Sequence, residues 1–208
     1  PQMNALAITP GTIASLVIAL SFAAGLNLYV TICALGIMAR MHWVVLPGEL
    51  GALESAWIIG VSAALFAAEF FADKVPGFDL IWNALHTFIR VPVAALLAYA
   101  AGSHLTPEIQ LLVTCLGAAI AAIAHSSKTS LRLAVTPSPE PLSNITLSSS
   151  EDVAALGLTW AATHHPLIAG GVVAALCVGC IVAMLWGFRV IRNALRRIFR
   201  EQSSKEAS

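Results

Sequence analysis

Charged side chains are scarce in this sequence. Only 11% of its 208 residues are Asp, Glu, Lys or Arg, whereas a soluble domain carries about 25%. Hydrophobic residues make up 58% of the chain. This composition excludes an ordinary soluble domain and predicts an all-α integral membrane protein. The formal net charge is zero and the basic residues concentrate at the C-terminus, so nucleic acid is not an expected partner.

Cysteine and the spacings typical of metal or catalytic sites are scarce as well. The four cysteines lie in apolar segments, which argues against a disulfide framework. Cys177 and Cys180 form a C-x-x-C without a second pair, and the adjacent His164 and His165 point to different helix faces. No nucleophile is paired with a base. We therefore expect no metal, no cofactor and no enzymatic activity.

Long apolar runs dominate the chain. A spanning helix needs about 20 mostly apolar residues, and no Lys or Arg precedes the first run, so this run is expected to stay in the mature protein rather than act as a cleaved signal. The segment 151–165 is apolar for only about a dozen residues, which leaves five or six spans open. The segments that pass are 11–39, 52–72, 79–101, 107–125, which is expected to continue as a helix to residue 135, and 167–188.

The distribution of Lys and Arg favours six spans. The tail 189–208 is rich in arginine, which places the C-terminus in the cytoplasm by the positive-inside rule. With six spans, Lys74, Lys128 and Arg132 lie on the same side, and Arg40 is the main exception. We therefore expect a multi-pass protein of the inner membrane, whose tail forms a basic amphipathic helix on anionic lipids.

Residues 1–188 are expected to form one transmembrane domain with an internal repeat. Three helices followed by three give two copies, 11–101 and 107–188, that face opposite ways in the membrane. The strings "EFFADKVP" and "TWAATHHP" both end in a proline that begins the next helix. The strings "AGLNLYVT" and "AHSSKTSL" are expected to be matching breaks, rich in small residues, within long helices.

A polar stripe follows one helix of the first half. Asp79, Asn83, His86 and Arg90 are spaced 4, 3 and 4 residues apart, which places them on one face of a helix. Arg90 lies about 16 Å along from Asp79 and so near the middle of a hydrocarbon core about 30 Å thick. A charge at that depth costs about 2.5 to 3.5 kcal/mol and should face a partner or a wet cavity.

Two further polar stripes could meet the first one. His125, Lys128 and Arg132 share one helix face, and Glu69 and Asp73 share another. The simplest pairing joins Arg90 to Glu69, and Lys128 or Arg132 to Asp73 or Asp79. Asn27 follows Gly25 in the first span, where its amide can hydrogen-bond a neighbouring helix or a ligand. The residues expected to line a substrate or ion pathway are Asn27, Glu69, Asp73, Asp79, Asn83, His86, Arg90, His125, Lys128 and Arg132.

The longest polar connection runs from residue 136 to residue 152. It contains three prolines and ends in "SSSED", which is typical of a helix start. Ser149 or Ser150 would be the capping residue, and Glu151 and Asp152 would stabilise the positive end of the helix dipole. Capping is a sufficient explanation for these acidic residues.

Four strings together resemble a known family. They are "AAGLNLYVT", "AEFFADKVPGFDLIWNALHTFIRVP", "AHSSKTSLRLAV" and "SPEPLSN", and the combination is similar to a bacterial membrane family described as domain of unknown function 4126. The resemblance extends from about residue 16 to residue 187. It implies that these motifs belong together, and it supplies no substrate and no catalytic residue.

The polar stripes predict a membrane transporter or channel, with a charged site near the bilayer midplane for an anionic small molecule or a phosphate-bearing lipid. The alternative is a scaffold or assembly subunit whose buried charges only hold helices together. An intramembrane enzyme that uses Glu69 or His86 as a base is a third hypothesis, without a paired nucleophile to support it. Membrane lipids are expected partners, and a homo-oligomer stays open.

Overall fold

The structure, a computed structural model, contains helices joined by short connections and no strand in the residues that it describes, which are 9–73, 78–135 and 141–206. The order of elements is the one expected for an all-α membrane protein. The elements are α1 (Pro10–Leu26), α2 (Leu28–Arg40), the 3-10 helix η1 (Gly48–Glu54), α3 (Ala56–Ala72), α4 (Phe78–Ala101), α5 (Pro107–Val135), α6 (Pro141–His164) and α7 (Pro166–Glu206).

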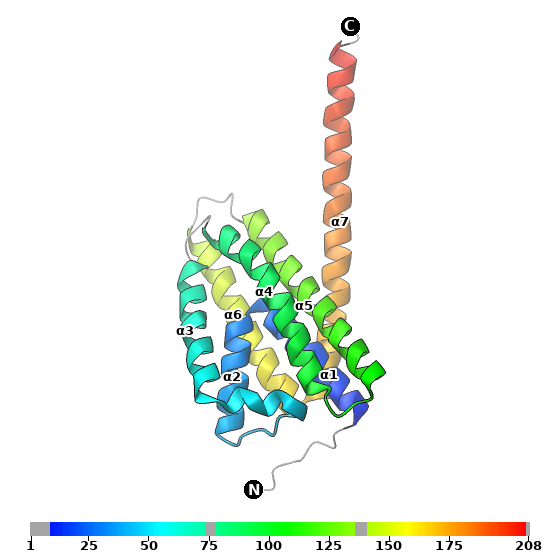
Figure 1. Cartoon of the computed structure of the whole chain (residues 1–208). Coiled ribbons are helices and arrows are strands. Elements are labelled where there is room, and N and C mark those ends of the chain that lie inside the picture. The colour runs from blue at the N-terminus through cyan, green and yellow to red at the C-terminus, as the bar shows by residue number, and fades with distance from the viewer. Residues whose placement is uncertain (1–8, 74–77, 136–140, 207–208) are drawn as a thin grey trace.

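The helix α1 lies at the centre of the bundle. Thr9 caps its start through a reciprocal hydrogen-bonding pair with Thr12, and Pro10 occupies the first turn. The residues that follow are apolar or small on every side, so α1 has no face suited to lipid or water alone. It packs against α4, α5, α6 and α7, and Figure 1 shows it enclosed by these helices.

The helices α1 and α2 form a hairpin that enters the bundle and returns. In Figure 1, α1 rises from the lower end to about the middle, and α2 descends to the same end. Contacts agree with this path, because a Cβ on Gly36 of α2 would meet Leu53 of η1 and a Cβ on Gly170 of α7 would meet Ser15 of α1. The break expected within 24–31 is confirmed, because Asn27 adopts an extended backbone between α1 and α2. The single continuous span expected over 11–39 is wrong, because the chain turns back at this break (Figure 1).

The remaining helices run between the two ends of the bundle (Figure 1). Among the described helices, three are long and apolar enough to cross a membrane, and the pair formed by η1 and α3, bent by 74°, makes a fourth if it is counted as one span. The helix α6 is 24 residues long, about 36 Å at 1.5 Å per residue, although its first half is polar. The three candidate spans are Ile81–Ala101, Pro107–Leu133 and Pro166–Val190.

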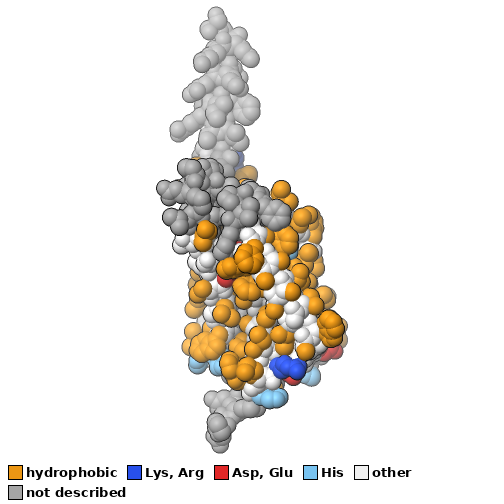
Figure 2. Space-filling view, turned by 90° about the vertical axis from the view of Figure 1, so that its left-hand side faces the viewer, with side chains coloured by type: hydrophobic (Ala, Val, Ile, Leu, Met, Phe, Trp, Pro, Cys, Tyr) orange, Lys and Arg blue, Asp and Glu red, His pale blue; other side chains and the backbone are white. Residues whose placement is uncertain are grey.

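The outer surface of the bundle carries large apolar side chains. Trp57 is 82% exposed, Phe88 81% and Phe71 70%. In Figure 2 hydrophobic side chains cover much of the face shown, and the Arg or Lys and most His side chains that are visible gather near its lower rim. An apolar surface that ends in a polar rim is the surface that a lipid bilayer requires. The protein is therefore embedded in a membrane.

The helix α6 begins ten residues earlier than the sequence indicated. The expected polar connection 136–152 is helical from Pro141 onward, so neither Ser149 nor Ser150 caps a helix start. The hydroxyl of Ser150 instead donates to the carbonyl oxygen of Leu147, at 2.7 Å. Bonding of this kind lets serine continue a helix, and the serine run was therefore misread as a boundary.

Two further expectations about the helices have clear outcomes. The helix α5 does continue through residue 135, as predicted. The break expected within 124–131 is wrong, because α5 is continuous there. The helix α7 also runs without interruption past residue 188 to Glu206 and projects beyond the rest of the bundle (Figure 1), so the basic tail up to that residue continues the last helix.

Candidate functional site

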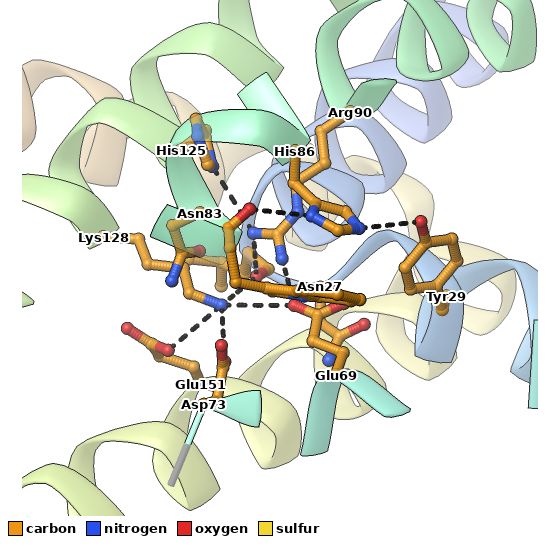
Figure 3. A network of polar contacts seen from close by, with 12 residues as sticks. Asn27, Tyr29, Glu69, Asp73, Asn83, His86, Arg90, His125, Lys128 and Glu151 are labelled. Atoms are coloured by element: carbon orange, nitrogen blue, oxygen red, sulfur yellow. Dashed lines mark hydrogen bonds and ion pairs between the residues drawn. The ribbon is translucent and has the colours of Figure 1, made fainter. Parts of the chain in front are cut away.

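A chain of ion pairs crosses the interior of the bundle between α3, α4 and α5 (Figure 3). The guanidinium of Arg90 on α4 pairs with Glu69 on α3, and both side chains are completely buried. Glu69 Oε1 also lies 3.5 Å from Lys128 Nζ on α5, and this ammonium lies 3.2 Å from Asp73 Oδ2. The pairing of Arg90 with Glu69 that the sequence indicated is confirmed.

The chain of ion pairs continues to α6. Arg132 Nη2 lies 2.8 Å from Asp73 Oδ2 and 2.6 Å from Glu151 Oε2, and Lys128 Nζ lies 3.3 Å from the same oxygen of Glu151. The pairing of both Lys128 and Arg132 with Asp73 is confirmed. Cations and carboxylates therefore alternate along a path from Arg90 to Arg132. Arg132 lies one turn beyond Lys128, toward the end of α5. We call these residues, with Asp152, the charged cluster: Glu69, Asp73, Arg90, Lys128, Arg132, Glu151 and Asp152.

The tip of the α1–α2 hairpin meets this cluster. A helix that ends inside a membrane leaves carbonyl groups without intrahelical partners. Here Arg90 Nη1 donates to the carbonyl oxygens of Leu26, at 3.1 Å, and of Gly25, at 3.5 Å. Lys128 Nζ donates to the same oxygen of Leu26, at 3.0 Å. The two cations therefore satisfy the end of α1 and also lie at the negative end of its dipole.

Asn27 forms the hinge of the hairpin. Its side-chain oxygen accepts from the backbone N–H of Val30, at 3.1 Å, and so caps α2. Its amide nitrogen donates to Asp152 Oδ1 on α6, at 2.8 Å. The expectation that Asn27 hydrogen-bonds a neighbouring helix is confirmed, and its partner is a buried carboxyl group.

His125 of α5 lies between two residues of α4, Arg90 and Thr87, in a hydrogen-bonded chain. Arg90 Nη1 lies 3.4 Å from His125 Nδ1, and arginine has no acceptor, so the imidazole nitrogen accepts. His125 Nε2 lies 2.7 Å from the hydroxyl of Thr87, which lies 3.2 Å from the carbonyl oxygen of Asn83. Every donor has an acceptor when a neutral imidazole donates from Nε2 and the threonine donates to that carbonyl.

His86 lies beside the ion pairs and makes contacts of its own. Its Nδ1 is 2.8 Å from the carbonyl oxygen of Trp82, which only accepts, so Nδ1 carries the proton. Its Nε2 then accepts from the hydroxyl of Tyr29, at 3.0 Å. The ring packs against Trp82, with centroids 4.4 Å apart. His86 therefore connects α4 to α2 on the side of the hairpin tip.

The sequence-derived stripes converge at one place, with one exception. Figure 3 shows Asn83, His86, Arg90, His125 and Lys128 turned toward a common centre with Asn27, Glu69 and Asp73, and each of these eight side chains is buried. Asp79 lies in the first turn of α4, outside the part of the helix whose side chains the structure describes. Whether these residues form a pathway stays a prediction.

Sequence reasoning missed four residues of this region. Glu151 and Asp152 were assigned to a helix cap, and Tyr29 and Thr87 were not considered. A signal was present in α6, where small or polar residues recur every three or four positions and all prove to be buried. These positions are Ser148, Asp152, Ala155, Thr159 and Ala162.

The cluster is suited to holding charge rather than a metal. Among the side chains that the structure describes, four carboxylates face three cations in this cluster, so one negative charge is unbalanced when all seven groups are ionised and the histidines are neutral. The residues that the structure describes contain no group of three or more His, Cys, Asp or Glu side chains able to hold a metal ion. Such a cluster can bind or release a proton, or exchange a carboxylate partner for an anion.

Comparison with known proteins gives a family and no described relative. Searches of the curated proteins and of the solved structures return no significant match. One family model matches residues 14–186. This range contains most of α1, all of α2 to α6, the charged cluster and the first half of α7. The chain therefore belongs to the family described as domain of unknown function (DUF4126).

Proposed function

We propose that the protein is a membrane transporter or channel whose site is the charged cluster at the tip of the α1–α2 hairpin. The observation that supports this most is that two buried cations, Arg90 and Lys128, bind a helix end inside the bundle, while a third buried cation, Arg132, lies one turn beyond Lys128 on α5. Non-helical backbone at membrane depth is tolerated where it is buried in protein or lines a water-filled cavity. Transporters often build their sites from such broken helices.

The substrate class that fits these cations is an anion, either a small organic anion or the phosphate group of a lipid. Each cation now has a carboxylate partner, so an anion would enter by replacing one of them. Glu151 is the partner most exposed to solvent, at 8% of its side chain. Exchange would therefore begin at Arg132 and Lys128 and proceed inward to Arg90.

The proposal includes a direction in the membrane. Lys128, Arg132 and the basic tail after residue 188 lie toward the upper end in Figure 1, which becomes the cytoplasmic side of an inner membrane by the positive-inside rule. Arg40 at the lower end donates to the carbonyl oxygen of Glu54. The helix directions also support an inverted repeat, because α2 runs opposite to α5, α3 opposite to α6, and α4 opposite to α7 (Figure 1).

One observation favours the alternative, a scaffold that does not transport. Arg90, Lys128 and Arg132 are buried and each is in an ion pair with a carboxylate, and such pairs can simply fix helices in place. However, a buried ion pair stabilises a fold little more than well-packed apolar residues of similar volume. We propose that the cluster serves a function beyond stability and that no catalytic step is involved.

Flux in liposomes tests the proposal. Purified protein is reconstituted with two probes: inorganic phosphate trapped inside, and phosphatidylglycerol with a fluorescent label that external dithionite bleaches. Release of phosphate indicates a soluble anion, and complete bleaching indicates movement of lipid between leaflets. We expect the wild type to move one of the two probes. Arg90→Gln should reduce the rate of that movement at least tenfold, and Arg40→Gln should retain it.

Two outcomes would contradict the proposal. The first is an absence of protein-dependent movement in both arms with correctly folded protein. The second is a rate for Arg90→Gln equal to that of Arg40→Gln. Circular dichroism and gel filtration of each variant establish that it is folded. A stoichiometric complex recovered on gentle extraction, without flux, would support the scaffold instead.

A further inference from the structure

The structure assigns a proton-binding site to Asp152. This carboxyl group is 9% exposed and lies on the buried face of α6. Its Oδ1 accepts from the amide of Asn27, at 2.8 Å, while its Oδ2 is buried without a hydrogen-bond partner. Unlike Glu69, Asp73 and Glu151, it has no cation within ion-pair distance among the described residues.

Charge balance explains why the site takes a proton. The cluster holds one more carboxylate than cations, and the other three carboxylates are all in ion pairs. The helix ends at the hairpin tip do not change this balance, because the negative end of α1 and the positive end of α2 each contribute about half a charge of opposite sign. An unpaired charge in the bundle interior costs several kcal/mol, and one proton removes that cost.

The surroundings of Asp152 single it out as the group that takes the proton. From α5 it faces the ammonium of Lys128, which already contacts three carboxylates. From α3 it faces the carboxylates of Glu69 and Asp73, and Glu151 is adjacent on α6. The helix α1 has no titratable residue. The other titratable groups on the helices packed against α6 are Tyr29, Cys33 and Arg40 of α2, Glu108, Cys115, His125 and Arg132 of α5, and Cys177, Cys180 and the basic tail of α7.

The neighbours also argue against a metal cation at this position. A sodium or potassium ion needs several oxygen ligands, and the carbonyl oxygen of Leu26 at the end of α1 already accepts from Arg90 and Lys128. Two cations so close would repel a third. A proton needs only the lone pair of Oδ2.

A consequence for transport rests on the proposed function. When an anion replaces Glu151 as partner of Arg132 and water reaches α6, the proton on Asp152 can leave to water. The step breaks one O–H bond and forms another on a water molecule, and no electron is transferred. Movement of the anion would then be coupled to the binding and release of one proton.

Infrared spectroscopy tests the site without any transport assay, so failure of the flux experiment does not decide it. Protein in lipid at neutral pH is compared with Asp152→Asn and with Glu108→Gln, which removes an exposed carboxyl group of α5 outside the charged cluster. We expect a carbonyl band of a protonated carboxyl group in the wild type, its loss in Asp152→Asn and its retention in Glu108→Gln. On raising the pH, the band should disappear with release of one proton.

Isotope labelling keeps the test valid if Asp152→Asn does not fold. Carbon-13 at the side-chain carboxyl of aspartate should shift the band in the wild type, whereas the same label in glutamate should leave it in place. Absence of a protonated-carboxyl band, its survival in folded Asp152→Asn, or a shift with labelled glutamate alone would overturn the assignment.

Discussion

Arg90 of α4 and Glu69 of α3 form an ion pair in which neither side chain has any solvent exposure. The same guanidinium also donates to the carbonyl oxygen of Leu26 at the end of α1. One side chain therefore joins three helices at the point where the hairpin turns. Four experiments test this arrangement and the hairpin that depends on it.

The ion pair itself can be tested by a double-mutant cycle. Arg90→Met should lower the free energy of unfolding by about 3 to 5 kcal/mol, because it leaves a buried carboxylate without its main partner. The double variant with Glu69→Gln should recover a large part of this loss. The measurement is unfolding in mixed micelles, with Arg40→Gln as the control for an exposed arginine. Additive effects of the two changes would show that the pair is not coupled.

The close approach of α1 and α5 can be tested at a glycine. A Cβ on Gly25 would lie 2.6 Å from the carbonyl oxygen of Ala121 and 2.7 Å from the Cβ of Ala124. Gly25→Val should therefore push the helices apart and lower the yield of folded protein, at a cost of about 1 to 3 kcal/mol or more. Gly60→Val is the matched control, because nothing lies within 4 Å of that position. Equal behaviour of the two variants in thermal melts would contradict the packing.

The hinge residue Asn27 performs two tasks that substitutions can separate. Asn27→Ala removes the cap of α2, which costs about 0.5 to 2 kcal/mol, and also the donor to Asp152, which costs about 1 to 3 kcal/mol. Asn27→Ser retains an oxygen that can cap the helix and loses only the second bond. We expect the melting temperature to be highest for the wild type, lower for Asn27→Ser and lowest for Asn27→Ala. A serine variant as unstable as the alanine variant would show that the cap contributes nothing.

The hairpin makes a topological prediction. Single cysteines at Gly11 and Met41, both exposed near the lower end, should react with an impermeant thiol reagent from the same side of the membrane. A cysteine at Ile145, near the start of α6, should react from the other side. The background replaces the four native cysteines by alanine. If Gly11→Cys and Met41→Cys react from opposite sides, the pair α1 and α2 crosses the membrane and the hairpin does not exist.

Much of the site could be predicted because charges in a membrane need partners. The helical spacing of Asn83, His86 and Arg90 identified one face of α4, and the depth of Arg90 required a carboxylate, which Glu69 supplies. Composition alone indicated the membrane and the helices. These inferences use only local periodicity and the cost of burying charge.

The break near Asn27 was expected, but the reversal of the chain there and the start of α6 could not be predicted in the same way. The run 11–39 is apolar throughout, so hydropathy cannot tell one long helix from two short ones that turn back. The difference depends on Arg90 and Lys128, which lie outside that run. They donate hydrogen bonds from α4 and α5 to the carbonyl oxygen at the end of α1. Glu151 and Asp152 were likewise assigned to a cap, because their partners Arg132 and Asn27 are distant in sequence or on another helix.

The central claim is that the charged cluster opens to water, and the most direct test is the reactivity of a thiol at Ser148. This side chain is fully buried on α6, one turn from Asp152 toward the upper end. Ala169 on α7 is also buried, at 3% exposure, and lies far along the chain near the lower end. In the cysteine-free background, we predict that Ser148→Cys in membranes reacts with an impermeant thiol reagent and Ala169→Cys does not. Equal protection of both thiols in folded protein would contradict the claim.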